Sequence, residues 1–199
     1  ASAKIHQLNA DALCVVAPSD HLILDEEAFM KNVYEGLTYA QQHDSLVTLG
    51  IRPSRPDTGY GYIQYIDTQT TQHIYKVKTF TEKPNAKLAK AFIESGDFVW
   101  NSGMFVWKVR SIIRAFEKYM PDVSEVFEEG GDHFTRESEE AFIKKAFAKL
   151  SRKAFSSLRV TALTIALNED AAVPVFSVIK SLGYVGTKKS IYFITKSYG

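Results

Sequence analysis

The sequence predicts an α/β fold, and two observations carry that prediction. Apolar runs at residues 12–17 and 45–51 are typical of strands, and the segment between them has helical periodicity. A strand, a helix and a strand in this order form a β-α-β unit, whose usual right-handed crossover places both strands parallel in one sheet.

The first strand is predicted to be buried, because residues 12–17 form the continuous apolar run found in sheets with both faces covered. The helix predicted over residues 25–42 is amphipathic. Its apolar residues, among them Phe29 and Val33, recur at helical spacing, and Asp25 is a suitable N-cap. We therefore expect the helix to pack on the sheet.

Alternating apolar and helical patterns continue along the rest of the chain. They predict further strands at residues 62–66, 74–81, 103–107 and 190–195. They predict further helices at residues 84–93, 111–120 and 138–150. Apolar runs without a clear period occupy residues 160–167 and 171–179. No internal repeat or linker divides the chain.

Composition excludes several classes of protein. With 45% hydrophobic residues in 199, the chain is able to bury a core. Its net charge of +1 argues against a general electrostatic attraction to nucleic acid or to an anionic membrane. No apolar run approaches the roughly 20 residues that span a bilayer. Cys14 has no second cysteine to pair with, so we expect a reducing compartment, the cytoplasm.

A polar loop follows the first strand, at the kind of position where ligands bind in α/β sheets. Asp20 there suits a Mg²⁺ ion held between protein and phosphates, because Mg²⁺ prefers hard oxygen ligands. The alternative is that Ser19 or Asp20 caps the next helix. His21 is either a ligand-binding residue or an ordinary hydrogen-bonded loop residue.

Three later motifs suit a sugar phosphate. Gly59 and Gly61 let the backbone approach a bound group, and Tyr60 offers a face and a hydroxyl, although a hairpin turn has the same composition. Glu82 would accept sugar hydroxyls and Lys83 would neutralise a phosphate, although both also fit a solvated pair beside a turn.

The third of these motifs places an amide and a hydroxyl just before an apolar strand. Asn101 is able to donate to sugar hydroxyls and to accept from them, and Ser102 follows it directly. Both residue types also form ordinary turns, so the motif by itself leaves the two interpretations open.

In their order along the chain, PSDH, TGYGYI, FTEKP and WNSGMF resemble the landmarks of the mannose-1-phosphate guanylyltransferases over residues 13–150. The resemblance implies a nucleotide-diphospho-sugar transferase fold, a GT-A-like, Rossmann-like mixed sheet flanked by helices. The reaction it implies joins GTP and mannose 1-phosphate to give GDP-mannose and pyrophosphate.

The resemblance also implies roles for particular residues. Asp20 would bind a catalytic Mg²⁺, and Lys83 would act with it in catalysis. The substrate-binding residues would be Ser19, His21, Gly59, Tyr60, Gly61, Glu82, Lys83, Asn101 and Ser102.

The chain departs from the family pattern in two places. It lacks the glycine-rich loop with Arg and Lys that would cradle the nucleotide phosphates upstream of residue 12, so the N-terminal unit of the fold would be missing. Residues 1–150 would form the core of the nucleotidyltransferase domain, and residues 151–199 match its C-terminal part poorly. We therefore expect an incomplete enzyme that is inactive by itself.

Other interpretations stay open. In one of them the chain is a non-catalytic module that binds a sugar phosphate. In another it is a nucleotidyltransferase for another hexose 1-phosphate. A downstream isomerase domain, as in some relatives, would lie beyond this sequence. Apolar surface left uncovered by the missing unit would favour a homo-oligomer.

Overall fold

The computed structural model describes residues 1–18, 21–71, 73–131, 133–134, 136–150, 174–184 and 187–197. Ser19 and Asp20, which the sequence places at the metal and substrate site, lie outside the described residues, as does the apolar run at residues 160–167. No helix among the described residues is long and apolar enough to cross a bilayer.

The described chain contains both strands and helices, with β2, β3 and β4 in direct succession and α4, α5 and α6 in direct succession. The strands are β1 (Leu13–Val16), β2 (Ser45–Ile51), β3 (Tyr62–Thr71), β4 (Ile74–Thr81), β5 (Phe98–Lys108), β6 (Pro174–Tyr184) and β7 (Thr187–Ser197). The helices are α1 (Ser2–Leu8), α2 (Glu26–Gln42), α3 (Ala86–Ser95), α4 (Val109–Tyr119), α5 (Pro121–Glu128) and α6 (Glu139–Lys149).

All the strands belong to one mixed sheet. Its order is β1-β5-β2-β7-β4-β3, and β6 adds to it by pairing with β7. The pair β4 and β7 runs parallel, whereas β2 with β5, β2 with β7 and β3 with β4 run antiparallel. The predicted α/β class with a mixed sheet flanked by helices is therefore confirmed.

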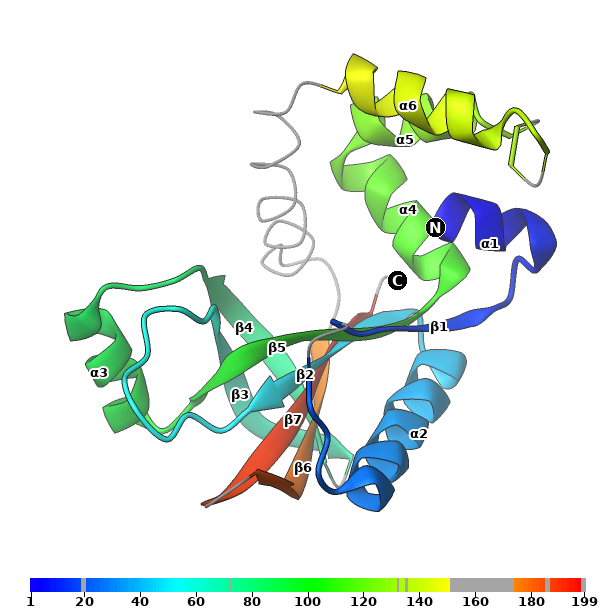
Figure 1. Cartoon of the computed structure of the whole chain (residues 1–199). Helices are drawn as coiled ribbons and strands as arrows, with labels where there is room; N and C mark the ends of the chain where they lie inside the picture. The colour runs from blue at the N-terminus through cyan, green and yellow to red at the C-terminus, as the bar shows by residue number, and fades with distance from the viewer. Residues whose placement is uncertain are drawn as a thin grey trace. The chain divides into compact units, whose positions relative to one another are not determined.

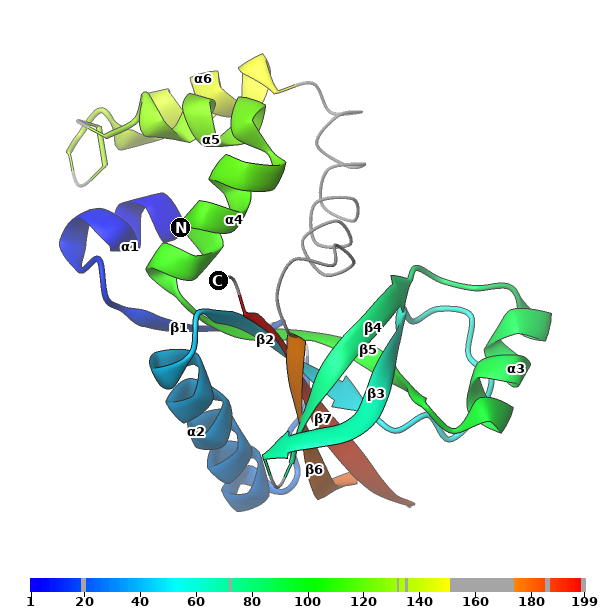
Figure 2. The ribbon, with the colours of Figure 1, turned by 180° about the vertical axis from the view of Figure 1, so that it is seen from behind.

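The described chain forms two compact units. One comprises residues 1–12 and 108–150, and the other comprises residues 13–107 with the strands between 174 and 197. Figure 1 shows the first unit as a group of helices in which α1 lies beside α4. Figure 2 shows the second unit from behind, with α2 running along the sheet. We call them the helical unit and the sheet unit.

The first strand differs from its prediction. β1 is shorter than the apolar run, and Val15 and Val16 are 42% and 44% exposed, so the expected burial is wrong. The reason is topological: β1 ends the strand order and has β5 as its neighbour, so β5 separates it from β2. The β-α-β unit thus places both of its strands in one sheet but not side by side.

The helix after β1 forms as the sequence predicts. Asp25 caps α2, because its Oδ1 accepts a hydrogen bond of 2.9 Å from the amide of Ala28. Tyr39 and Ala40, on the apolar face of α2, are buried in a core with Val47 and Leu49 of β2. Such burial of an apolar stripe supplies most of the stability of a helix in a protein.

Two helices escaped the sequence analysis. The predictions left residues 1–11 and 121–137 without an element, but α1 and α5 form there. α5 begins at Pro121, whose fixed φ and missing N–H suit the first position of a helix. Both helices are short, and a periodic pattern is hard to detect over so few residues.

Candidate functional site

The sheet ladder brings three of the sequence motifs to one place. Tyr62, the first residue of β3, pairs with Thr81 of β4 on one side and with Trp100 of β5 on the other. The residues that adjoin this row of the ladder are Gly61, Glu82 and Asn101, so they converge beside it. We call these three residues the strand-end cluster.

Gly61 lies at the centre of the strand-end cluster. Its carbonyl oxygen accepts a hydrogen bond of 2.8 Å from the amide of Asn101. A Cβ atom at position 61 would lie 3.2 Å from Oε2 of Glu82 and 3.6 Å from Cβ of Asn101. The absence of a Cβ at position 61 thus lets three chain segments lie close together, whereas the approach of Gly61 to a bound group stays a prediction.

Asn101 is held by its side-chain oxygen. Oδ1 accepts a hydrogen bond of 3.0 Å from the amide of Gly103. The hydroxyl of Thr48 lies 3.5 Å from Oδ1 and donates its proton to the nearer carbonyl of Met104 at 2.9 Å. Because an N–H must meet an acceptor, the bond from Gly103 fixes the orientation of the amide. Within the described part of the chain Nδ2 has no hydrogen-bond partner, so it is free to donate to a substrate hydroxyl.

A β-bulge separates Asn101 from the rest of its strand. Gly50 of β2 pairs with Asn101, but Thr48, two residues away, pairs with Phe105, so β5 carries extra residues between these points. Gly103 within the bulge has φ of 74°, a value that favours glycine. Bulges are common next to binding sites, and this one begins directly after Asn101.

Ser102 is used by the fold itself. Its hydroxyl donates a hydrogen bond of 2.6 Å to the carbonyl of Leu49 and accepts one of 3.1 Å from the amide of Met104. The residue is buried, so its hydroxyl satisfies backbone groups of the bulge. Contact with a substrate at Ser102 stays a prediction, and the structure provides a separate reason for the serine.

Glu82 and Lys83 follow the end of β4. Their charged atoms Oε1 and Nζ are 3.8 Å apart, and their side chains are 46% and 63% exposed. An exposed pair at this distance contributes little to stability, so both side chains are free to rearrange around a ligand. The backbone of Lys83 has φ of 34°, an uncommon value for a residue other than glycine, and such strained positions cluster at binding sites.

Asp57 organises the loop that leads into Gly61. Its Oδ1 accepts a hydrogen bond of 2.8 Å from the amide of Gly59, and Oδ2 lies 2.5 Å from the guanidinium of Arg55. Its backbone oxygen accepts a hydrogen bond of 2.9 Å from the hydroxyl of Tyr62. The Gly59 amide, followed by Arg55, holds the pKa of Asp57 below its ordinary value.

An aromatic stack lies beside the strand-end cluster. The rings of Tyr60 and Trp100 are stacked at 4.7 Å, and the guanidinium of Arg55 lies 5.4 Å from the Trp100 ring. Trp100 is buried, whereas Tyr60 is 39% exposed. The sequence analysis selected Tyr60 but missed Arg55, Asp57 and Trp100. The spacing of Asp57 and Gly59 was an available signal, because Asp often binds a backbone amide two residues ahead.

The PSDH motif is only partly described. Pro18 approaches the bulge: its Cγ lies 3.4 Å from the position that a Cβ of Gly103 would take. His21 is exposed and forms no hydrogen bond or ion pair with other described residues. The structure thus brings one flank of PSDH near the WNSGMF motif and leaves the roles of Ser19, Asp20 and His21 as predictions.

Metal-ligating side chains are scattered over the described part of the chain. Among them, no group of three or more His, Cys, Asp or Glu side chains is placed to hold an ion. Mg²⁺ often binds through only one or two carboxylates and completes its shell with water and substrate phosphates. A site built on Asp20 and phosphate oxygens is of that type, and it remains a proposal.

Comparison with known proteins assigns a family. The sequence profile described as nucleotidyl transferase matches residues 1–148. A mannose-1-phosphate guanylyltransferase from Escherichia coli is 37% identical over 151 residues, which cover 71% of this chain and 31% of that protein. The chain therefore spans about a third of the length of this curated relative.

Two solved structures resemble the fold. One, titled mannose-6-phosphate isomerase from Helicobacter pylori, is 32% identical with a TM-score of 0.57, over 65% of this chain and 48% of that one. The other, titled mannose-1-phosphate geranyltransferase from Thermus thermophilus, is 27% identical with a TM-score of 0.59, over 72% of this chain and 41% of that one. All three motifs of the strand-end cluster lie inside the matched family region.

Proposed function

Because the chain belongs to the nucleotidyl transferase family, we propose that this protein serves the transfer of a guanylyl group from GTP to mannose 1-phosphate. The products are GDP-mannose and pyrophosphate. The convergence of Gly61, Glu82 and Asn101 is the observation that supports the sugar-phosphate side of this proposal. The guanylyltransferase relative supports the choice of nucleotide and sugar.

The strand-end cluster suits a sugar phosphate chemically. The Glu82 carboxylate accepts hydrogen bonds from sugar hydroxyls, and Nδ2 of Asn101 donates to them. Lys83 places an ammonium next to Glu82, where it neutralises the phosphate. Gly61 leaves open the space that a side chain would fill, and Tyr60 offers an exposed edge beside it.

The reaction needs positioning more than a protein nucleophile. A phosphate oxygen of the sugar phosphate attacks the α-phosphorus of GTP, the new O–P bond forms, and the bond to the β-phosphate breaks to release pyrophosphate. Residues that hold the acceptor phosphate in line with the leaving group lower the entropic part of the barrier. Mg²⁺, when bound through Asp20 and the phosphates, would supply charge neutralisation.

The finer assignments belong to the same proposal. We propose a cytoplasmic location, which the single cysteine supports, and self-association, which the exposed Val15 and Val16 of β1 support. We expect neither nucleic acid nor membrane as a partner, because the net charge is +1. A monomer at every protein concentration in analytical ultracentrifugation would refute the proposed self-association.

The experiment measures pyrophosphate release with GTP, Mg²⁺ and mannose 1-phosphate, and separately the binding of mannose 1-phosphate by calorimetry. Both are measured on this chain and on any longer product of its coding region. We expect both forms to bind mannose 1-phosphate. We expect pyrophosphate release only from a form that contains a phosphate-binding loop. Binding of mannose 1-phosphate without turnover in every form would identify a non-catalytic sugar-phosphate module. Tighter binding of glucose 1-phosphate would show that the substrate is another hexose 1-phosphate.

A further inference from the structure

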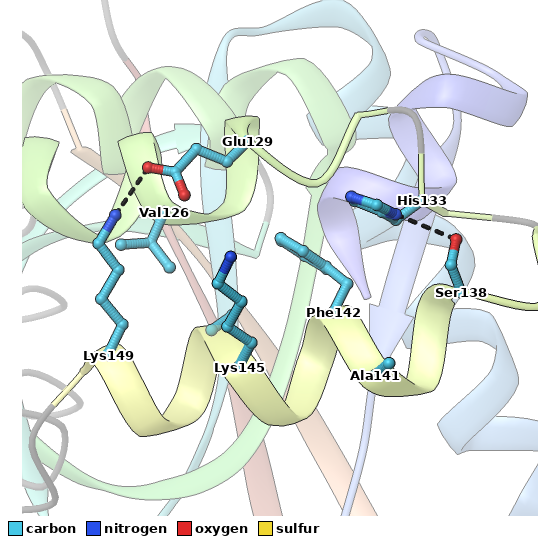
Figure 3. A pocket seen from close by; sticks show the side chains of 9 residues that line it. Val126, Glu129, His133, Ser138, Ala141, Phe142, Lys145 and Lys149 are labelled. Atoms are coloured by element: carbon cyan, nitrogen blue, oxygen red, sulfur yellow. Dashed lines mark hydrogen bonds and ion pairs between the residues drawn. The ribbon is translucent and has the colours of Figure 1, made fainter.

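The helical unit contains a cavity that the proposed function does not use. It has a volume of about 260 Å³ and lies between α5 with the loop after it and α6 (Figure 3). Its apolar floor consists of Val126, Phe142 and Ala146, which are buried in the core of this unit. The cavity shares no residue with the strand-end cluster.

The floor of the cavity is held in place by ring packing. Phe142 stacks on His133, with ring centroids 5.2 Å apart and planes at 12°, and Phe134 meets it edge-on at 5.5 Å. A Cβ atom at Gly130 would lie 2.3 Å from the Phe142 ring, so the ring packs directly on the backbone there. A rigid floor of this kind is pre-organised and loses little entropy when a ligand binds.

Three side chains set the charge at one end of the cavity. Nζ of Lys149 lies 2.7 Å from Oε1 of Glu129, and Lys149, with a smaller contribution from Lys145, lowers the pKa of Glu129. Lys145 forms no hydrogen bond or ion pair with any other described residue. Figure 3 shows it rising from α6 between Phe142 and the Lys149 pair. Two lysines and one glutamate thus give the described lining of the cavity one positive charge in excess.

The other end of the cavity carries a hydrogen-bonded pair of polar side chains. Nδ1 of His133 and the hydroxyl of Ser138 are 3.0 Å apart. Figure 3 shows this pair on the side of Phe142 away from Lys149. The pair anchors the imidazole ring over the floor and leaves a hydroxyl lone pair or proton for a second partner.

We propose that this cavity binds a small organic monocarboxylate with an apolar or aromatic body. The positive charge in excess, which Lys145 supplies, matches a single negative charge. A dianion such as a phosphate monoester would keep one negative charge uncompensated beside the apolar floor. The apolar floor and the stacked rings match a flat apolar body, and the volume of about 260 Å³ accommodates a molecule of the size of benzoate.

The test uses benzoate as the probe, with nitrogen-15 chemical shifts of the whole chain as the readout. We expect shifts in α6 and after α5, with a Kd of about 1 mM, and binding at least about fivefold weaker for benzyl alcohol and for inorganic phosphate. Equal binding of phosphate would show a general basic patch and overturn the proposal. Shift changes confined to the sheet unit would overturn it as well.

Three variants locate the binding site. Lys145→Met keeps the stem and removes the charge, and we expect benzoate to bind about fivefold more weakly. Ala141→Leu fills the cavity from the exposed side of α6 and should abolish binding while the charges remain. Lys144→Met is the matched control, because Lys144 is 76% exposed and pairs with Glu140. Wild-type affinity in both Lys145→Met and Ala141→Leu would refute the site.

Discussion

The two units of this protein position their side chains by different physical means. In the sheet unit, the backbone ladder around Tyr62 determines where Gly61, Glu82 and Asn101 lie. In the helical unit, no ladder is available, and one buried ring, Phe142, sets the shape of the cavity. The difference suggests that changes at the strand-end cluster alter binding with little loss of stability, whereas changes around Phe142 alter stability first.

The largest expected effect lies in the helical unit. Gly130→Ala would place a Cβ 2.3 Å from the buried Phe142 ring, so the ring and the turn that follows α5 must separate. We expect a loss of about 2 kcal/mol in the free energy of unfolding, measured by chemical denaturation. Gly131→Ala is the matched control, because its nearest neighbours lie at 3.4 and 3.5 Å, and it should change stability by less than about 0.5 kcal/mol. Equal losses of stability in the two variants would show that packing on the Phe142 ring does not control the stability of the helical unit.

The next effect lies in the strand-end cluster. Glu82→Gln keeps the shape but removes the charge that accepts sugar hydroxyls, and we expect mannose 1-phosphate to bind about tenfold more weakly by calorimetry. The free energy of unfolding should be unchanged, because the side chain is 46% exposed. Glu94→Gln, on the exposed face of α3, is the control and should bind normally. Normal binding by the Glu82 variant would remove this residue from the sugar site.

A smaller effect is expected at the close approach itself. In Gly61→Ala the new Cβ meets the end of a flexible side chain, Glu82, at 3.2 Å, so the carboxylate shifts by a few tenths of an ångström. We expect mannose 1-phosphate to bind about threefold more weakly, with the melting temperature unchanged. A large fall in melting temperature would show that the sheet unit is as rigid here as the helical unit is at Gly130.

The smallest effect concerns pH. The pKa of Asp57 is lowered by the Gly59 amide and by Arg55, so its contacts are intact above the ordinary aspartate value of about 3.9 and are lost only as the pH falls below it. We expect the Gly59 amide shift to titrate with a midpoint below 3.9. Asp57→Asn should abolish that titration. A midpoint above 3.9 would show that the loop is not held by this carboxylate.

Much of the fold was predictable from local patterns. α2 with its Asp25 cap and the strands β2 and β4 form where the periodicity indicates, because each pairs a regular apolar pattern with clear boundaries. The burial of β1 was not predictable, since the same apolar run is compatible with a central strand or an edge strand. Only the strand order distinguishes the two.

The candidate site likewise has features that local patterns predict and features that depend on the arrangement of the strands. The motifs show which residue types are available, namely the glycines of TGYGYI, the charges of FTEKP and the amide of WNSGMF. The fold brings Gly61, Glu82 and Asn101 together, turns the Ser102 hydroxyl to the backbone and anchors the loop through Asp57. Residue chemistry is a local property, whereas proximity depends on strand register, which pairs residues some fifty positions apart, such as Gly50 and Asn101.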